Sequence, residues 1–198
     1  MATVIETQTK AELAAKKLLT AQEFRELAPE ETPEFCELEK GKVIQLPPPT
    51  FLHGHLCNEF AWWLTNYVKA NESGHVGTND SAVVTARDPD TVRGADVSYY
   101  SFTKIPRGVI PTGYFEFVPD LVAEVLSPSD RWPAVLSKVA EYLAAEVQVV
   151  LVIDPEPESK TIRVFRIDGT IDVLHDGDTL TLPTLMPGFE LPLAKLFG

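Results

Sequence analysis

Glu124 stands in the middle of a short aliphatic run, DLVAEVL, which extends from Asp120 to Leu126. The length and composition of this run predict a β-strand. Side chains alternate between the two faces of a strand, so Glu124 shares a face with Val122 and Leu126. An ionised carboxylate among aliphatic side chains is costly unless it is paired or binds a metal ion. Glu124 is therefore the first candidate for chemistry in this chain.

Asp96 lies in a similar setting, at the predicted start of a strand from Asp96 to Phe102. The segment before it, from Arg87 to Gly94, is rich in aspartate, proline and glycine and predicts a loop. Two acidic groups on strands that flank a loop could converge on one divalent cation, and hard oxygen ligands suit Mg²⁺ or Mn²⁺. Taken alone, Glu124 could instead be an edge residue or the partner of an arginine, and Asp96 a turn or cap residue.

The apolar periodicity predicts the elements that must position these two residues, and their order indicates an α/β fold. The predicted elements are a helix capped by Thr20, a hairpin of Cys36–Leu38 and Lys42–Leu46, a helix from His53 to Glu72, strands Val76–Thr85, Asp96–Phe102 and Asp120–Leu126, a helix from Trp132 to Ala145, a strand Val147–Ile153, and a hairpin of Ile162–Ile167 and Ile171–Leu174. Strand, helix and strand in succession indicate a parallel crossover. The apolar tail from Leu180 to Phe197 is expected to pack back over the body.

The chain has 198 residues and a hydrophobic content of 44%, which suits one globular domain. We expect residues 1–18 to be a flexible extension and residues 19–198 to be the domain. No apolar run approaches the roughly 20 residues that span a bilayer, and the first residues lack the pattern of a secretory signal. A cytoplasmic location and no membrane partner are therefore expected. Cys36 and Cys57 match no metal-binding spacing, so reduced thiols are expected.

The formal net charge of −12 bears on any interaction with nucleic acid. A surface that binds phosphates is normally basic, because the release of counterions supplies much of the affinity. This chain has no lysine or arginine run. Three interpretations remain open: the basic residues gather only in the fold, a divalent metal ion offsets the carboxylates, or the partner is not nucleic acid.

Eight segments, in order along the chain, resemble a known family. They are LTAQEF, CELEKGKVIQLP, HGHL, VRGADVSYYS, PDLVAEVLSPSDR, KVAEYLAAEV, VLVIDP and LMPGFELPLAKLF. Together they extend from about Leu19 to Phe197, and they resemble the Uma-type restriction endonucleases of the PD-(D/E)xK nuclease superfamily. The segment PDLVAEVLSPSD is the most specific. The resemblance implies a restriction-endonuclease-like core, a mixed central sheet flanked by helices, with an N-terminal helix and hairpin.

The resemblance also implies a set of site residues. It places the first metal carboxylate on Asp96 and the second on Glu124, as ligands of Mg²⁺ or Mn²⁺, and adds Glu37 as a further acidic contact. In the superfamily a lysine stands two residues after the second carboxylate, but here that residue is Leu126. The family takes its lysine from the following helix, where Lys138 matches. The implied catalytic set is therefore these two carboxylates with Lys138 and Glu37.

The helical spacing agrees with this assignment of Lys138. The residue lies on the rim of the apolar stripe of its helix, from where its stem can follow the core and its amine can reach a neighbouring site. Alone, it could be an ordinary surface lysine. His53 is interpreted as a helix-end residue with local contacts, Asp130 as a helix cap and Tyr142 as a core or supporting residue.

The chain departs from the family pattern at three positions. Many relatives carry proline before the first aspartate, where this chain has Ala95, and glycine before the buried strand, where it has Glu146. These two changes are expected to be tolerated. Many relatives also carry aspartate four residues before the lysine, where this chain has Ala134. That change could remove a contact that holds the lysine.

The leading prediction is a Mg²⁺-dependent endonuclease that hydrolyses phosphodiester bonds of nucleic acid, with DNA as the expected polymer. The alternative is a catalytically inactive nuclease-fold protein that acts as a binding or regulatory module, which the acidic charge, Leu126 and Ala134 favour. Hydrolysis of a small substrate by paired carboxylates, as in glycosidases, ranks lower, because only Trp62 and Trp63 offer an aromatic platform and one of them is expected in the core. Analogy with dimeric nucleases suggests a homodimer formed through Trp62 or the N-terminal helix.

Overall fold

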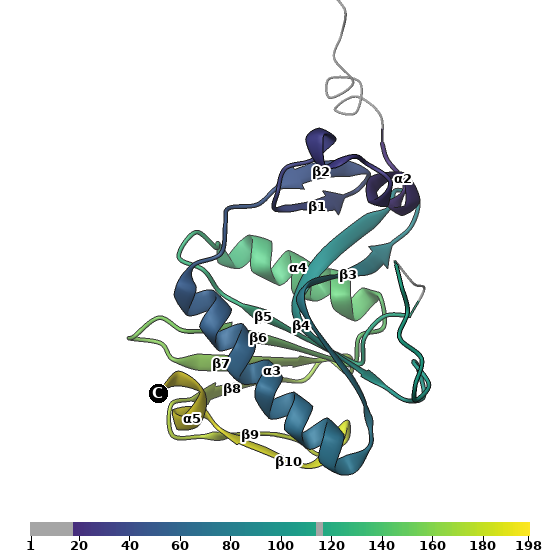
Figure 1. Cartoon of the computed structure of the whole chain (residues 1–198). Coiled ribbons are helices and arrows are strands. Elements are labelled where there is room, and N and C mark those ends of the chain that lie inside the picture. The colour runs from purple at the N-terminus through teal and green to yellow at the C-terminus, as the bar shows by residue number, and fades with distance from the viewer. Residues whose placement is uncertain (1–17, 114–116) are drawn as a thin grey trace, which may run out of the picture.

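The computed structural model describes residues 18–113 and 117–198, and its centre is an eight-stranded mixed sheet (Figure 1). The strand order is β2-β1-β4-β5-β6-β7-β8, and β3 also pairs with β4. These strands are β1 (Cys36–Glu39), β2 (Lys42–Gln45), β3 (Gly74–Ala86), β4 (Thr91–Ser101), β5 (Leu121–Val125), β6 (Val149–Asp154), β7 (Thr161–Arg166) and β8 (Ile171–His175). The extension predicted over residues 1–18 lies, apart from Leu18, outside the described residues.

Helices cover both faces of the sheet. The helical elements are α2 (Ala21–Arg25), a 3₁₀ turn η1 (Pro29–Glu31), α3 (Phe51–Asn71), α4 (Trp132–Ala144) and α5 (Leu193–Phe197). The long helix α3 crosses one face and α4 lies behind the sheet on the other (Figure 1). Among the described residues, no helix is both long and apolar enough to span a bilayer. The predicted α/β architecture, with a mixed sheet flanked by helices, is confirmed.

The alternation along β5 sorts its side chains between these two layers. Leu121 and Ala123 are fully buried in the core that includes α3, whereas Val122 is buried in the core that includes α4. Glu124, two residues after Val122, consequently faces α4. The neighbouring strand β6 pairs with β5 in parallel, as the strand–helix–strand order predicts.

Most of the predicted elements are confirmed, with small shifts at their ends. Thr20 and Glu23 form the expected capping box at the start of α2. The predicted hairpins are β1 with β2 and β7 with β8. The tail forms a two-stranded sheet, β9 (Thr179–Leu182) with β10 (Met186–Pro192), and its apolar residues join the core under α3. Trp63 packs against this core while Trp62 is 56% exposed.

Two predictions about local structure are wrong. The loop predicted over Arg87 to Gly94 ends at residue 90, because β4 begins at Thr91 and pairs with β3 from there. Asp96 therefore lies in the middle of a strand, with Val92 buried before it. The proline and glycine content predicted a loop, but pairing with strand β3 stabilises a strand over its last residues. Asp130 does not cap α4: its carboxylate accepts from the Ser127 N–H, and the N-cap position is residue 131.

A gap along one edge of β4 creates the space for a site. β3 occupies one edge of β4 along almost its whole length. β1 and β5 share the other edge: β1 pairs at Val92, and β5 pairs at Val97 to Tyr99. Between these two pairings the edge of β4 carries Arg93 and Asp96. Among the described residues no strand pairs with this stretch on that edge, and the Gly94 N–H there donates to the Glu37 side chain instead.

Glu146, at the end of α4, offers a test of the fold. Its φ is +70°, in the left-handed region that favours glycine. The Glu146 N–H donates to the Leu143 carbonyl and the Val147 N–H to the Tyr142 carbonyl, the Schellman pattern that commonly ends a helix on glycine. This is the position where the family resemblance leads one to expect glycine.

Glu146→Gly is expected to raise the free energy of unfolding by ~0.5–1 kcal/mol. It removes a left-handed strain of about 1–2 kcal/mol, which the greater freedom of glycine in the unfolded chain partly offsets. Urea unfolding followed by circular dichroism measures this difference. Glu146→Ala is the control and should give no such gain, since alanine keeps the β-carbon. A glycine variant no more stable than the alanine variant would contradict the prediction.

Candidate active site

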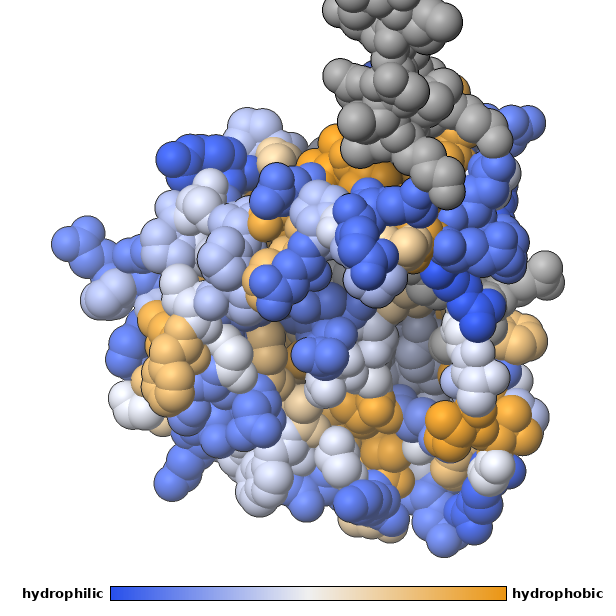
Figure 2. Space-filling view, turned by 45° about the horizontal axis from the view of Figure 1, so that its top comes forward, coloured by the Kyte–Doolittle hydropathy of each residue, from blue (hydrophilic) through white to orange (hydrophobic). Residues whose placement is uncertain are grey.

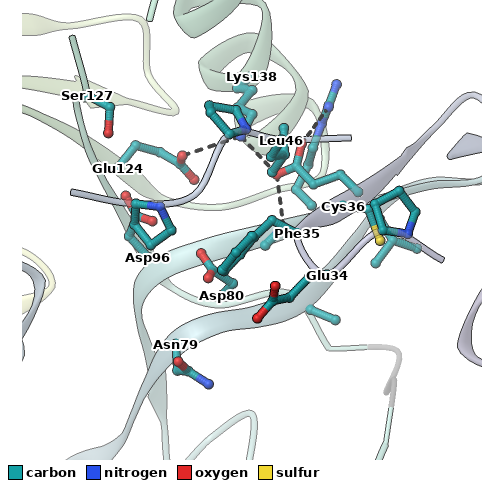
Figure 3. Close-up of a pocket in the computed structure, with 18 of the residues that line it drawn as sticks. Glu34, Phe35, Cys36, Leu46, Asn79, Asp80, Asp96, Glu124, Ser127 and Lys138 are labelled. Atoms are coloured by element: carbon teal, nitrogen blue, oxygen red, sulfur yellow. Dashed lines mark hydrogen bonds and ion pairs between the residues drawn. The ribbon is translucent and has the colours of Figure 1, made fainter. Parts of the chain in front are cut away.

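A cavity of about 550 Å³ opens beside this gap, and the four residues of the predicted site all line it. Glu37 comes from β1, Asp96 from β4, Glu124 from β5 and Lys138 from α4. Figure 3 shows Asp96, Glu124 and Lys138 directed toward one another on one side of the cavity. The fold thus brings together side chains that are up to about a hundred positions apart in the chain. Their chemical roles remain predictions.

Glu124 is buried, and neighbouring groups compensate the charge of its carboxylate only in part. Its Oε1 accepts a 2.8 Å hydrogen bond from the hydroxyl of Tyr142, and its Oε2 lies 3.7 Å from the Nζ of Lys138. Burial raises the pKa of Glu124 to about 8; Lys138 opposes this rise and Asp96 adds to it. A carboxylate in this state gains from a further positive charge nearby. Tyr142 is fully buried and supports Glu124, as expected of a core residue.

Asp96 is held by the adjacent strand β5 and by helix α3. Its Oδ2 accepts a 2.6 Å hydrogen bond from the Val125 N–H of β5 and lies 3.2 Å from the Nε2 of His53 on α3. Its residue is 8% exposed, so the carboxylate is largely withdrawn from water. These contacts fix the orientation of one Asp96 oxygen next to the strand that carries Glu124.

Glu37 bridges the cations of the site. It accepts hydrogen bonds from Arg93 Nη1 at 2.9 Å, from the Gly94 N–H at 3.1 Å and from Lys138 Nζ at 2.8 Å. Both oxygens of Glu37 are therefore engaged. The contacts favour a role for Glu37 in positioning the amine of Lys138. The amine of Lys138 is held by Glu37, whereas the side chain of Ala134 has no polar group that could hold it. Leu126, which occupies the lysine position of the superfamily, is partly buried and packs against the core beside α4.

His53 is in the first turn of α3 and has a local contact with Cys57, as interpreted, but it also lines the cavity, which was not predicted from the sequence. Thr50 caps α3 by accepting from the His53 N–H, but the His53 imidazole reaches Asp96 on another element. The hydrogen bond with Asp96 raises the pKa of His53 to about 10, with a contribution from Cys57 and against the effect of burial. The HGHL motif at the helix start was the available signal.

Asp80 was also missed. It lies with Asn79 in a bulge of β3, and both have positive φ angles, 53° for Asp80 and 64° for Asn79. Gly94 on β4 leaves room for this bulge, since a β-carbon there would meet the Cβ of Asp80 at 2.9 Å. Burial and the nearby Asp96 raise the pKa of Asp80. Asn and Asp tolerate the left-handed region, but nothing in the sequence indicated where a bulge would point.

The cavity carries more negative than positive groups. Among the described residues, six acidic side chains line it, namely Glu34, Glu37, Asp80, Asp96, Glu124 and Asp130, against three basic ones, Arg25, Arg93 and Lys138, together with His53. The face turned forward in Figure 2 is mostly hydrophilic, with hydrophobic side chains in separate patches. Such a cavity attracts a cation and repels a polyanion unless a cation is bound.

Comparisons with known proteins agree on the type of fold. A family model described as "Putative restriction endonuclease", Uma2, matches residues 21–194. A crystal structure of "a putative nuclease belonging to DUF820" from Anabaena variabilis ATCC 29413 superposes with a TM-score of 0.77 at 24% identity, covering 90% of this chain and 97% of that chain. A search of curated proteins gave no match. Because the family model spans most of its length, the chain belongs to the Uma2 family of restriction-endonuclease-like proteins.

Proposed function

We propose that this protein is a nuclease that hydrolyses phosphodiester bonds of DNA and that Asp96 and Glu124 hold a divalent metal ion for that reaction. The observation that carries the proposal is the convergence of two buried carboxylates and one lysine on a single cavity. Membership of a family described as restriction endonucleases supports the reaction class. The polymer and the metal requirement are parts of the proposal.

The donor set fits a hard divalent cation. Asp96 and Glu124 offer carboxylate oxygens, which Mg²⁺ and Mn²⁺ prefer. The Oε2 of Glu124 has Lys138 at 3.7 Å, beyond a normal hydrogen bond, so it retains the capacity to bind a cation. The excess of acidic groups around the cavity favours the same kind of ligand.

Each remaining residue has a role that follows from its contacts. A bound ion would offset the charge of the scissile phosphate and make a nearby water more acidic. Lys138 can donate from Nζ to a phosphate oxygen and stabilise the charge that develops in the transition state. Burial lowers the pKa of Lys138, but Glu124 and Glu37 together raise it well above its ordinary value. The amine therefore stays protonated at neutral pH.

The test is cleavage of supercoiled plasmid DNA and of an RNA of similar length, with Mn²⁺ or Mg²⁺. The proposal predicts nicking of DNA that depends on the added metal and stops on chelation. A Lys138→Met protein purified by the same route is the control: it should bind Mn²⁺ yet cleave about 10²–10³-fold more slowly, the usual cost of one lost charge-stabilising donor.

Two outcomes would count against the proposal. Equal cleavage by the wild type and by Lys138→Met would indicate a contaminating nuclease. No cleavage, together with an unchanged melting temperature on addition of Mn²⁺, would favour the inactive nuclease-fold module, because a ligand bound only by the native state must raise stability. Faster cleavage of RNA than of DNA would overturn the proposed polymer.

A further inference from the structure

We propose that His53 is a third ligand of the ion at Asp96 and Glu124 and that Cys57 orients its imidazole ring, an inference that rests on the proposed function. His53 is in the first turn of α3, and its side chain is 14% exposed and lines the cavity. Its Nε2 lies 3.2 Å from the Oδ2 of Asp96. An imidazole nitrogen is thus already placed against one of the two proposed carboxylate ligands.

The other nitrogen of the ring faces the protein. Cys57 follows His53 by one helical turn, and its Sγ lies 3.6 Å from Nδ1. Cys57 packs against the core under α3 and is not among the side chains that line the cavity. In this structure Nε2–H faces the Asp96 carboxylate; an ion bound there would take the place of that proton, with Nδ1–H donated to the Cys57 sulfur. Histidines that bind metal ions usually have this arrangement, with the second nitrogen held by a partner.

His53, Cys57 and Asp96 form a group whose possible ligand atoms lie within 4.8 Å of one another. The thiol could in principle bind the ion itself. However, Nδ1 and Nε2 point in different directions from the ring, and Sγ is on the Nδ1 side. An ion shared with Asp96 therefore meets Nε2 and leaves Cys57 as the hydrogen-bond partner. Cys57 is a positioning residue in this assignment.

The additional nitrogen ligand has a consequence for metal choice. Mg²⁺ favours an octahedral shell of oxygen ligands, whereas imidazole suits transition metals. One imidazole with two carboxylates should therefore favour Mn²⁺ over Mg²⁺ at this site. We expect Mn²⁺ to bind at least about tenfold more tightly than Mg²⁺, an effect on the order of that of one contact that supports a metal ligand.

Pulsed electron paramagnetic resonance of the Mn²⁺-loaded full chain tests the nitrogen ligand directly. The wild type should show coupling of Mn²⁺ to ¹⁴N, and labelling with ¹⁵N-histidine should change it to the ¹⁵N pattern without any substitution. His53→Gln should lose the coupling. His55→Gln is the matched control, because His55 is exposed on the same helix, two residues further along, and stacks on Phe51.

Calorimetric titration separates the two residues. His53→Gln should weaken Mn²⁺ binding by about 10–100-fold and Mg²⁺ binding much less. Cys57→Ser keeps a hydrogen-bond acceptor and should bind Mn²⁺ as the wild type does, while Cys57→Ala should bind Mn²⁺ more weakly with Mg²⁺ affinity unchanged. Weaker binding of both ions by the alanine variant would indicate only a structural role for Cys57.

The failure of this inference differs from the failure of the proposed function. If Mn²⁺ binds in a manner that depends on Glu124 but shows no coupling to histidine nitrogen, His53 is excluded as a ligand. The proposal that the two carboxylates bind the ion would then still hold. A cobalt-loaded protein with a thiolate charge-transfer band that Cys57→Ser removes would show that Cys57 is itself a ligand and overturn its positioning role. No bound Mn²⁺ at all would overturn the metal site as a whole.

Discussion

Replacing Glu124 with glutamine is expected to abolish tight Mn²⁺ binding and to lower DNA cleavage by about 10³-fold or more. A bound ion typically supplies several kcal/mol of transition-state stabilisation, and each 1.36 kcal/mol corresponds to about a factor of ten in rate. The amide oxygen of glutamine can still accept from the hydroxyl of Tyr142, which holds the native carboxylate at 2.8 Å. Calorimetric titration with Mn²⁺ and a plasmid-nicking assay measure the two effects.

The stability of this variant separates loss of the ion from loss of the fold. Burial disfavours the charged form of Glu124, so a neutral side chain of the same shape should leave the free energy of unfolding no lower. Glu190→Gln on β10 is a matched control, since Glu190 is exposed and undergoes the same chemical change. Normal Mn²⁺ affinity in the Glu124 variant would exclude Glu124 as a ligand.

Arg93→Met is expected to lower the free energy of unfolding by about 3–5 kcal/mol, the usual effect of removing one partner from a buried ion pair. The Arg93 side chain is 5% exposed and donates to Glu37 and, with two nitrogens at 2.8 and 2.9 Å, to Glu141. Burial lowers the pKa of Arg93, but the carboxylates of Glu141 and Glu37 raise it above its ordinary value. Methionine would remove a cation that pairs with the carboxylate of Glu37, a residue that is itself only 3% exposed.

Chemical denaturation with Arg166→Met as a control tests this expectation. Arg166 pairs with Asp172 near the surface, with side chains 27% and 56% exposed, and exposed pairs contribute about 1 kcal/mol or less. Arg93→Lys should fall between the wild type and Arg93→Met, because an ammonium group cannot match the two-point contact with Glu141. Equal stability of the two methionine variants would show that the buried network does not hold this end of the sheet.

The parts of the site that depend on local pattern could be predicted from the sequence. Alternation along β5 was enough to place Glu124 on one face, and helical spacing was enough to put Lys138 on the rim of α4. Both inferences require only the period of a single element. Asp96 was a candidate from its setting at the start of a predicted strand, but that setting alone does not distinguish a site residue from a turn residue. The family resemblance then supported Asp96 and added Glu37.

The parts that depend on pairing between distant segments could not be predicted. Arg93 was assigned to a loop, yet it is the buried cation that holds Glu37. This arrangement exists because β1 reaches β4 at one register position, Leu38 opposite Val92. His53 and Asp80 contact Asp96 only because the first turn of α3 and the bulge of β3 both lie beside it, and neither approach leaves a periodic signal in the sequence.

The most direct test of the shared metal ion is a crystal of the wild-type protein soaked in Mn²⁺, with data collected to reveal anomalous scattering. Our account predicts a peak within ligand distance of a carboxylate oxygen of Asp96 and one of Glu124. A peak that touches neither residue, or clear density for both carboxylates with no anomalous peak at saturating Mn²⁺, would contradict it.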